Sequence, residues 1–184
     1  MVHALTIDVE DYYSVFARDR LDHDGPPTDA VVRNTDRVLR LLRDHDCRAT
    51  FFVLGEVAET FPDLVRAIAA EGHEVGVHGY AHRQVFRMEP ETFRADVRRA
   101  REAVEQAAGE PARGYRAPAF SIGRATAWAL EVLADLGFRY DSSVFPISGR
   151  RYGWPDAAPV IHPVPVGEGR SLVEVPLTTV RVLG

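Results

Sequence analysis

The stretch ATFFVLGEVAETFPDLVRAIAAEGHEVGVH, residues 49–78, contains two apolar segments separated by a helical pattern. Residues 49–54 form a short apolar run that is typical of a buried strand, and residues 73–78 form a second one. Between them Pro62 marks the start of a helix and Gly72 marks its end. A strand, a helix and a second strand in this order predict a β–α–β unit with parallel strands.

The same alternation continues on both sides of this unit. Strands are expected over residues 2–9, 114–117 and 138–144, with late candidates over 172–176 and 179–183; helices are expected over 29–46, 90–109 and 125–136; loops are expected over 10–27 and 149–169. Five clear strands and two late ones are fewer than a closed (β/α) barrel needs, since its eight units usually take about 250 residues. We therefore expect an α/β fold, an irregular (β/α) barrel that is incomplete at its C-terminus, in one domain over residues 1–184.

The composition is that of a globular domain, with 46% apolar and 27% charged residues among 184. The net charge of −5 argues against a nucleic acid partner. All 22 basic residues are arginine, which excludes Schiff-base and phosphate-loop lysines, and the single cysteine excludes an internal disulfide. Because we find no signal-peptide pattern and no apolar run near the roughly 20 residues of a membrane span, we expect a cytoplasmic protein.

Three acidic residues, Asp8, Glu10 and Asp11, stand at the carboxyl end of the first predicted strand. Residues i and i+2 of a strand face the same side, so Asp8 and Glu10 are expected to project together. Two carboxylates this close repel each other unless a cation or a proton separates them. A divalent metal held by one, with the other left as a base, satisfies this condition. A solvated strand end, or a helix cap at Asp11, is the competing interpretation.

Two histidines, His78 and His82, follow the third predicted strand. Neutral imidazoles bind zinc and related ions, and a spacing of four residues lets both rings reach one ion. The spacing alone is a weak signal. Its position strengthens it, because active sites of parallel α/β folds lie at the carboxyl ends of the strands. Two histidines and one carboxylate also leave a coordination position open for water, as a catalytic metal requires.

Arg116 and Asp141 stand at the ends of the fourth and fifth predicted strands. An arginine there can pair with Asp8 or bind an anion, and Asp141 can orient a histidine or another polar group. A surface arginine and a strand-end turn are the alternatives.

Several motifs together resemble the polysaccharide deacetylase family, whose members are metal-dependent carbohydrate esterases acting on N-acetylated sugars. They are TIDVED at 6–11, ATFFVLG at 49–55, HGYAH at 78–82, RAPAF at 116–120 and DSS at 141–143. The resemblance covers about residues 4–183 and implies an irregular (β/α) barrel of the polysaccharide deacetylase type. The segments DVEDYY and RRYG, the latter at 150–153, resemble the subgroup encoded with exosortase-linked exopolysaccharide loci.

The resemblance implies a hydrolase that removes N-acetyl groups from an amino-sugar polysaccharide or its precursor, with an N-acetylated glycan as its partner. A divalent metal, usually zinc, would bind water and the acetyl oxygen, while a carboxylate base takes the proton of the water and a histidine acid protonates the amine. Carried over, the catalytic residues are Asp8 as the base, Arg116 as the group that orients it, and Asp141, and the metal ligands are Glu10, His78 and His82.

The sequence departs from the family pattern in three ways. The order Asp-Val-Glu-Asp leaves Glu10 and Asp11 as competing ligands, and strand alternation favours Glu10. Gly79 stands where a serine or threonine is usual. A final histidine motif is missing, because His162 is expected to lie in the proline-rich loop.

From the missing histidine and the low strand count we expect a chain that lacks its C-terminal part and is much less active than a longer form. An amidase acting on small amides with the same scaffold, or a metal-binding or sugar-binding module with impaired catalysis, are the alternative functions. Zinc, cobalt and nickel all stay open as the metal, and so does the oligomeric state.

Overall fold

The computed structural model describes residues 4–21, 23–149, 153–167 and 169–179. The expected strand over residues 179–183 and the RRYG segment lie mostly outside these ranges. The chain divides into two compact units, the first made of Met1–His82 with Val97–Ala112 and the second of Arg83–Asp96 with Arg113–Gly184. The single-domain organisation expected from the length stays a prediction.

Three parallel strands form the centre of the first unit: β1 (Thr6–Val9), β2 (Thr50–Val53) and β3 (Glu74–Val77). The strand β2 lies in the middle, and the register places Phe52 between Asp8 on β1 and Gly76 on β3. Because β2 is covered on both faces, Phe51, Phe52 and Val53 are fully buried. This is why the strand reads as an unbroken apolar run rather than an alternating one.

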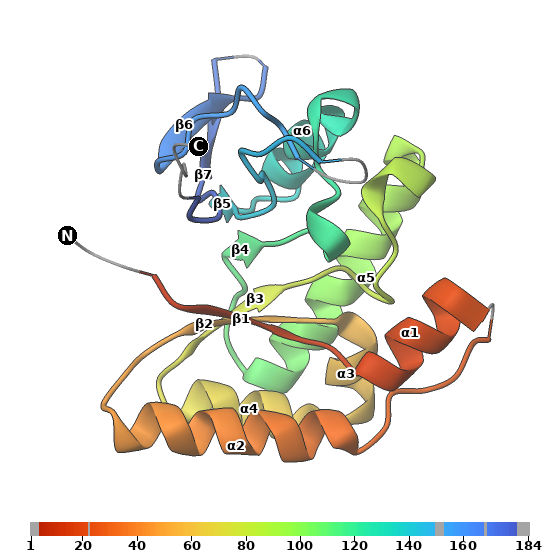
Figure 1. Ribbon diagram of the computed structural model, residues 1–184, viewed down its shortest axis with the longest axis vertical. Coiled ribbons are helices and arrows are strands. Elements are labelled where there is room, and N and C mark those ends of the chain that lie inside the picture. The colour runs from red at the N-terminus through yellow and green to blue at the C-terminus, as the bar shows by residue number, and fades with distance from the viewer. Residues whose placement is uncertain (1–3, 22, 150–152, 168, 180–184) are drawn as a thin grey trace, which may run out of the picture. The chain divides into compact units, whose positions relative to one another are not determined.

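Helices flank these strands: α1 (Tyr12–Leu21), α2 (Ala30–Asp44), α3 (Gly55–Thr60), α4 (Pro62–Ala70) and the part of α5 (Pro90–Ala108) that begins at Val97. Helices α2 and α4 lie side by side (Figure 1). The loop expected over residues 10–27 is wrong in its first half, where α1 forms. The Asp11 carboxylate accepts a hydrogen bond of 3.0 Å from the Ser14 amide, which caps the helix.

The described residues of the second unit form four strands in the spatial order β4, β5, β7, β6, where β4 and β7 are each parallel to β5 and β6 is antiparallel to β7. Their bounds are β4 (Gly114–Tyr115), β5 (Tyr140–Asp141), β6 (His162–Pro165) and β7 (Ser171–Glu174). The helical elements of its described residues are the part of α5 that ends at Asp96, α6 (Trp128–Asp135) and the single-turn 3₁₀ helices Val85–Arg87, Pro118–Phe120 and Arg124–Thr126.

Strand β6 contradicts the expectation of a continuous loop over residues 149–169, and with it the placement of His162 in a loop. His162 is the first residue of β6 and lies opposite Glu174 of β7. The two prolines, Pro163 and Pro165, are two residues apart, so the positions that lack an N–H lie on the same side of the strand. An edge strand tolerates this pattern, because that side needs no hydrogen-bonding neighbour.

The α/β class expected from the sequence is confirmed, since mostly parallel strands alternate with helices along the chain. Within the described ranges the strands do not close into a barrel. None of the helices that can be described is both long and apolar enough to cross a lipid bilayer.

Gly55, the first residue of α3, occupies a position where a side chain does not fit. A Cβ atom built there would lie 2.7 Å from Cδ2 of Tyr80 and 2.8 Å from Cα of Ala100. The second of these contacts is with the backbone of α5, which cannot move aside cheaply. The absence of a side chain at Gly55 therefore allows α3 to pack against both the loop after β3 and α5.

We expect Gly55→Ala to lower the free energy of unfolding by about 1–3 kcal/mol, the usual cost of overpacking a closely packed site. Urea denaturation of the wild type and the variant measures this difference. Gly25→Ala is the matched control, because a Cβ at Gly25 would meet no atom within 4 Å. Equal stabilities of the two variants would show that the packing around α3 does not depend on glycine.

Candidate metal centre

Three side chains of the first unit come together at the carboxyl ends of its strands. Glu10 directly follows β1, His78 directly follows β3, and His82 lies four residues further along the chain. One ligand atom from each residue lies within 4.8 Å of the other two, and both histidines are buried. Because β1 and β3 are parallel to the same central strand, their carboxyl ends meet at one edge of the sheet, as the sequence analysis assumed.

The spacing of these atoms is close to what one metal ion needs. The Oε2 atom of Glu10 lies 2.9 Å from Nε2 of His82 and 3.8 Å from Nε2 of His78. Two ligands of a tetrahedral zinc ion, bound at about 2.1 Å, are roughly 3.4 Å apart. These two distances lie on either side of this value, and all three ligand atoms lie within 4.8 Å of one another, so adjustments of the side chains are needed to reach a tetrahedral arrangement.

The electrostatics of Glu10 favour its charged form. Burial by itself would raise the pKa of the Glu10 carboxyl, but the hydrogen bond and charge of His82 and the charge of His78 outweigh it. The net result is a pKa below the ordinary value. Glu10 is therefore deprotonated in this environment, as a carboxylate ligand of a metal must be.

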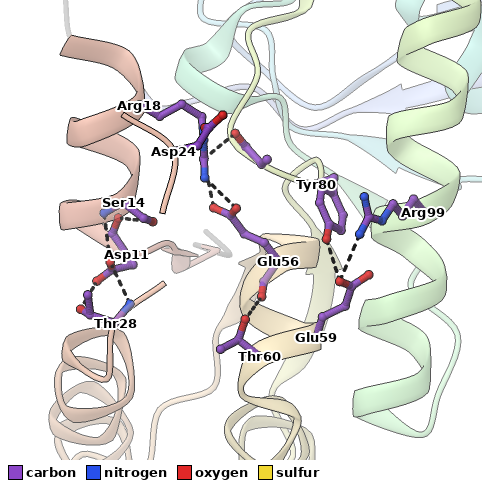
Figure 2. A network of polar contacts seen from close by, with 11 residues as sticks. Asp11, Ser14, Arg18, Asp24, Thr28, Glu56, Glu59, Thr60, Tyr80 and Arg99 are labelled. Carbon is purple, nitrogen blue, oxygen red and sulfur yellow. Dashed lines mark hydrogen bonds and ion pairs between the residues drawn. The ribbon is translucent and has the colours of Figure 1, made fainter. Parts of the chain in front are cut away.

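Asp11, the competing carboxylate, is held elsewhere. Its Oδ2 atom accepts hydrogen bonds from the amides of Ser14 (3.0 Å) and Thr28 (3.1 Å), and its Oδ1 atom accepts one from the Thr28 hydroxyl (2.9 Å), as Figure 2 shows. With 1% of its surface exposed, Asp11 caps α1 and ties it to the segment before α2. The structure therefore brings Glu10, and not Asp11, to the two histidines.

Asp8 lies beside this group without belonging to it. Its Oδ2 atom is 4.0 Å from Nε2 of His78, and its side chain is about one quarter exposed. Val9, between Asp8 and Glu10, is buried, so the two carboxylates share the opposite side of the chain. Asp8 thus has a carboxylate at the edge of the candidate metal centre, and its role as a base stays a prediction.

Arg116 and Asp141 belong to the second unit. The guanidinium of Arg116 donates hydrogen bonds to the carbonyl (3.1 Å) and the hydroxyl (2.8 Å) of Ser142. Asp141 accepts hydrogen bonds from the amide (2.9 Å) and the hydroxyl (2.6 Å) of Ser143. Arg116 directly follows β4, and its guanidinium is held at Ser142, just after β5. Asp141 is the last residue of β5. The orientation of Asp8 by Arg116, which the resemblance implies, stays a prediction.

Sequence reasoning missed a buried acid, Glu174 on β7. It lies opposite Asp141 in the register, has 1% of its surface exposed, and accepts a hydrogen bond from the Val144 amide (3.1 Å).

Burial and the charge of Asp141 raise the pKa of Glu174 to about 11. Burial also raises the pKa of Asp141, but hydrogen bonds from Glu174 and from Ser143 favour its charged form. Glu174 is therefore the member of the pair that keeps the proton. The alternation of Leu172 and Glu174 on one side of the strand was the available signal.

This pair gives a pH-dependent prediction. Unfolding near neutral pH frees the proton of Glu174, so the stability that it contributes is present below about pH 4.5 and falls as the pH rises towards about 11. The slope for one proton is at most about 1.4 kcal/mol per pH unit. Glu174→Gln carries no such proton, so we expect its stability relative to the wild type to increase from pH 5 to pH 8.

Urea denaturation at pH 5, 6.5 and 8 tests this expectation, with Glu131→Gln on the exposed face of α6 as the control. A stability difference between wild type and Glu174→Gln that stays constant over this range would contradict a buried, protonated Glu174.

Comparison with known proteins adds the family. Residues 23–140, more than half of the chain, match the model of the polysaccharide deacetylase family. The chain belongs to this family. A peptidoglycan-N-acetylglucosamine deacetylase from Bacillus cereus is 36% identical over 95 residues, which are 52% of this chain and 33% of that protein.

Solved structures agree with this assignment. A protein from Mycobacterium smegmatis, assigned as a polysaccharide deacetylase, superposes with a TM-score of 0.75 and 31% identity over 95% of this chain and 58% of that one. A CE4 family pseudoenzyme from Bacillus anthracis has a TM-score of 0.57 and 21% identity over 73% of this chain and 40% of its own, a likeness that shows the fold alone. The chain spans between one third and three fifths of the length of these relatives.

Proposed function

We propose that the protein is a metal-dependent deacetylase that hydrolyses the N-acetyl groups of an amino-sugar polysaccharide or its precursor, with zinc as the metal. The observation that carries this proposal is the group of Glu10, His78 and His82 with Asp8 beside it. Family membership supports the reaction class, because the curated relatives include deacetylases of peptidoglycan and of chitooligosaccharides.

The donor set fits a catalytic zinc site. Two imidazole nitrogens and one carboxylate oxygen are ligands that zinc binds well, and three protein ligands leave a position for substrate or water. A divalent ion at this position supplies Lewis-acid activation for the hydrolysis of an amide.

The chain itself supplies the base. The carboxylate of Asp8 accepts a proton from the attacking water, while the oxygen of that water forms a bond to the acetyl carbon. The bond between that carbon and the sugar nitrogen then breaks, which gives acetate and the free amine after the nitrogen takes up a proton. The 4.0 Å between Asp8 and His78 keeps the base close to the ligands without making it one of them.

His78→Ala and His82→Ala should each remove most of the bound metal, because two remaining ligands hold zinc poorly. Elemental analysis of the purified proteins gives the metal content per chain. His45→Ala, at an exposed position after α2, is the control and should keep the wild-type content. Full metal content in both site variants would place the metal elsewhere.

Asp8→Asn should keep the fold and the metal while lowering hydrolysis roughly 10²-fold or more, the loss expected when a positioned general base is removed. Acetate release by the metal-loaded protein measures the effect, and Asp63→Asn on the exposed side of α4 is the matched control. An Asp8→Asn variant with wild-type activity would assign the base to another group.

The reaction class is tested with a panel of substrates for the zinc-loaded protein. Chitooligosaccharides, peptidoglycan, N-acetylated exopolysaccharides and small amides are incubated separately, and acetate and free amine are measured. The exopolysaccharides are included because the DVEDYY segment resembles the exopolysaccharide-locus subgroup. Equal amounts of acetate and amine from a glycan support the proposal. Hydrolysis of small amides alone would indicate an amidase. Metal binding without any hydrolysis would contradict an active deacetylase and would agree with a binding module or with the impaired catalysis expected from the sequence. The cytoplasmic location expected from the sequence remains part of the proposal.

A further inference from the structure

The loop between the two histidines is fixed by hydrogen bonds to its backbone. The carbonyl of Gly79 accepts a hydrogen bond of 2.9 Å from the Gly55 amide, and the carbonyl of Tyr80 accepts one of 3.0 Å from the Glu56 amide. Both donors lie in the first turn of α3, where amides have no partner within the helix. The start of α3 thus holds the first two residues after His78.

The third carbonyl of this loop is held by a side chain from α1. The Nη1 atom of Arg18 donates a hydrogen bond of 2.9 Å to the carbonyl of Ala81 and one of 3.1 Å to Oε1 of Glu56, and its Nη2 atom lies 2.8 Å from Oε2 of Glu56. Figure 2 shows this two-pronged contact and the further hydrogen bond from Arg18 to Asp24. The pair is largely shielded from water, with 19% of the Arg18 and 11% of the Glu56 side chain exposed.

The position of the Ala81 carbonyl matters for His82. The carbonyl belongs to the peptide plane that ends at the His82 nitrogen, so a hydrogen bond to it restrains the φ angle of His82. That angle is +55°, in the left-handed region that residues other than glycine seldom adopt. The surrounding structure must hold such a conformation in place. The hydrogen bond from Arg18 to the Ala81 carbonyl therefore acts on the peptide group that sets the φ angle of His82.

The same helix also begins beside the carboxylate ligand. Asp11 caps α1 directly after Glu10, and Arg18 lies two turns further along that helix. Helix α1 therefore begins directly after its cap Asp11, which is next to the proposed ligand Glu10. Through Arg18 it also contacts Ala81, the residue before the proposed ligand His82.

We propose that Arg18 and Glu56 are positioning residues that hold His82 in the orientation needed to bind the metal together with Glu10 and His78. This inference rests on the proposed function. Glu56 holds the guanidinium in place through both of its oxygens, and Arg18 in turn holds the Ala81 carbonyl. A lysine cannot reproduce this contact, because a single ammonium lacks the planar fork of the guanidinium.

Arg18→Met should weaken zinc binding about 10- to 100-fold, the usual effect of removing a group that orients a metal ligand. Glu56→Gln keeps the shape but loses the charge and should weaken binding less. Arg18→Lys should recover part of the loss. Arg43→Met is the matched control, because it removes an ion pair between Arg43 and Glu71 in which the Arg43 side chain is 60% exposed. This variant should leave zinc binding unchanged.

Zinc affinity is measured by competition with a chelator of known affinity, and the visible spectrum of the cobalt-loaded proteins reports the coordination geometry. The unfolding midpoint of each metal-free protein shows whether the variant is folded. We expect a changed cobalt spectrum and weaker zinc binding for the Arg18 variants at a retained unfolding transition. A purely structural ion pair would shift the midpoint and leave the spectrum of the folded protein unchanged.

Three outcomes separate this inference from the proposed function. Loss of zinc in His82→Ala, together with wild-type affinity and spectrum in Arg18→Met, overturns the positioning role and leaves the metal site intact. Full zinc binding in His82→Ala overturns the metal site and the inference with it. If Arg18→Met does not fold, Arg18→Lys and Glu56→Gln decide the question, and wild-type affinity and spectrum in both overturn the inference.

Discussion

Two backbone hydrogen bonds, from the amides of Gly55 and Glu56 to the carbonyls of Gly79 and Tyr80, hold the loop between His78 and His82, on which the geometry of the candidate site depends. They join the end of the most buried strand of the first unit to the loop that carries both histidines. They can form because Gly55 has no side chain, which lets the start of α3 approach this loop and α5 at the same time. The start of α3 thus holds the carbonyls of Gly79 and Tyr80, while the side chain of Arg18 holds the carbonyl of Ala81 that precedes His82.

Local patterns in the sequence predicted most of the first unit, since its strands and the helices α2 and α4 follow from apolar periodicity and from Pro62 and Gly72. Strand alternation also put Asp8 and Glu10 on one side. Helix α1 escaped prediction because it depends on a cap and on contacts with distant residues rather than on an apolar stripe. The contact between Arg18 and Ala81 joins residues 63 positions apart, which no local pattern reveals.

Two glutamates that are shielded from water to different degrees have opposite pKa shifts. Glu10 is surrounded by His78 and His82, whose charges and hydrogen bonding outweigh the cost of burial and keep its pKa low. Glu174 is more deeply buried and lies opposite another carboxylate, so its pKa is raised to about 11 and it keeps a proton. The difference follows from the deeper burial of Glu174 and from the neighbours, which are histidines around Glu10 and a carboxylate beside Glu174. A carboxylate suited to bind a cation and a carboxylic acid suited to donate a hydrogen bond are thus built from the same residue type.

Backbone strain is concentrated in the motifs that the sequence analysis selected for their chemistry. Among the described residues four positions other than glycine have a positive φ angle: Asp46, His82, Ala119 and Phe120. The first ends a helix, where such a conformation is common. The other three lie in HGYAH and RAPAF, and each costs on the order of 1–3 kcal/mol unless the surroundings stabilise it. Glycine adopts this conformation at Gly72 without strain. Glycine at position 82 would relieve the strain but would remove the imidazole that the proposed metal site uses.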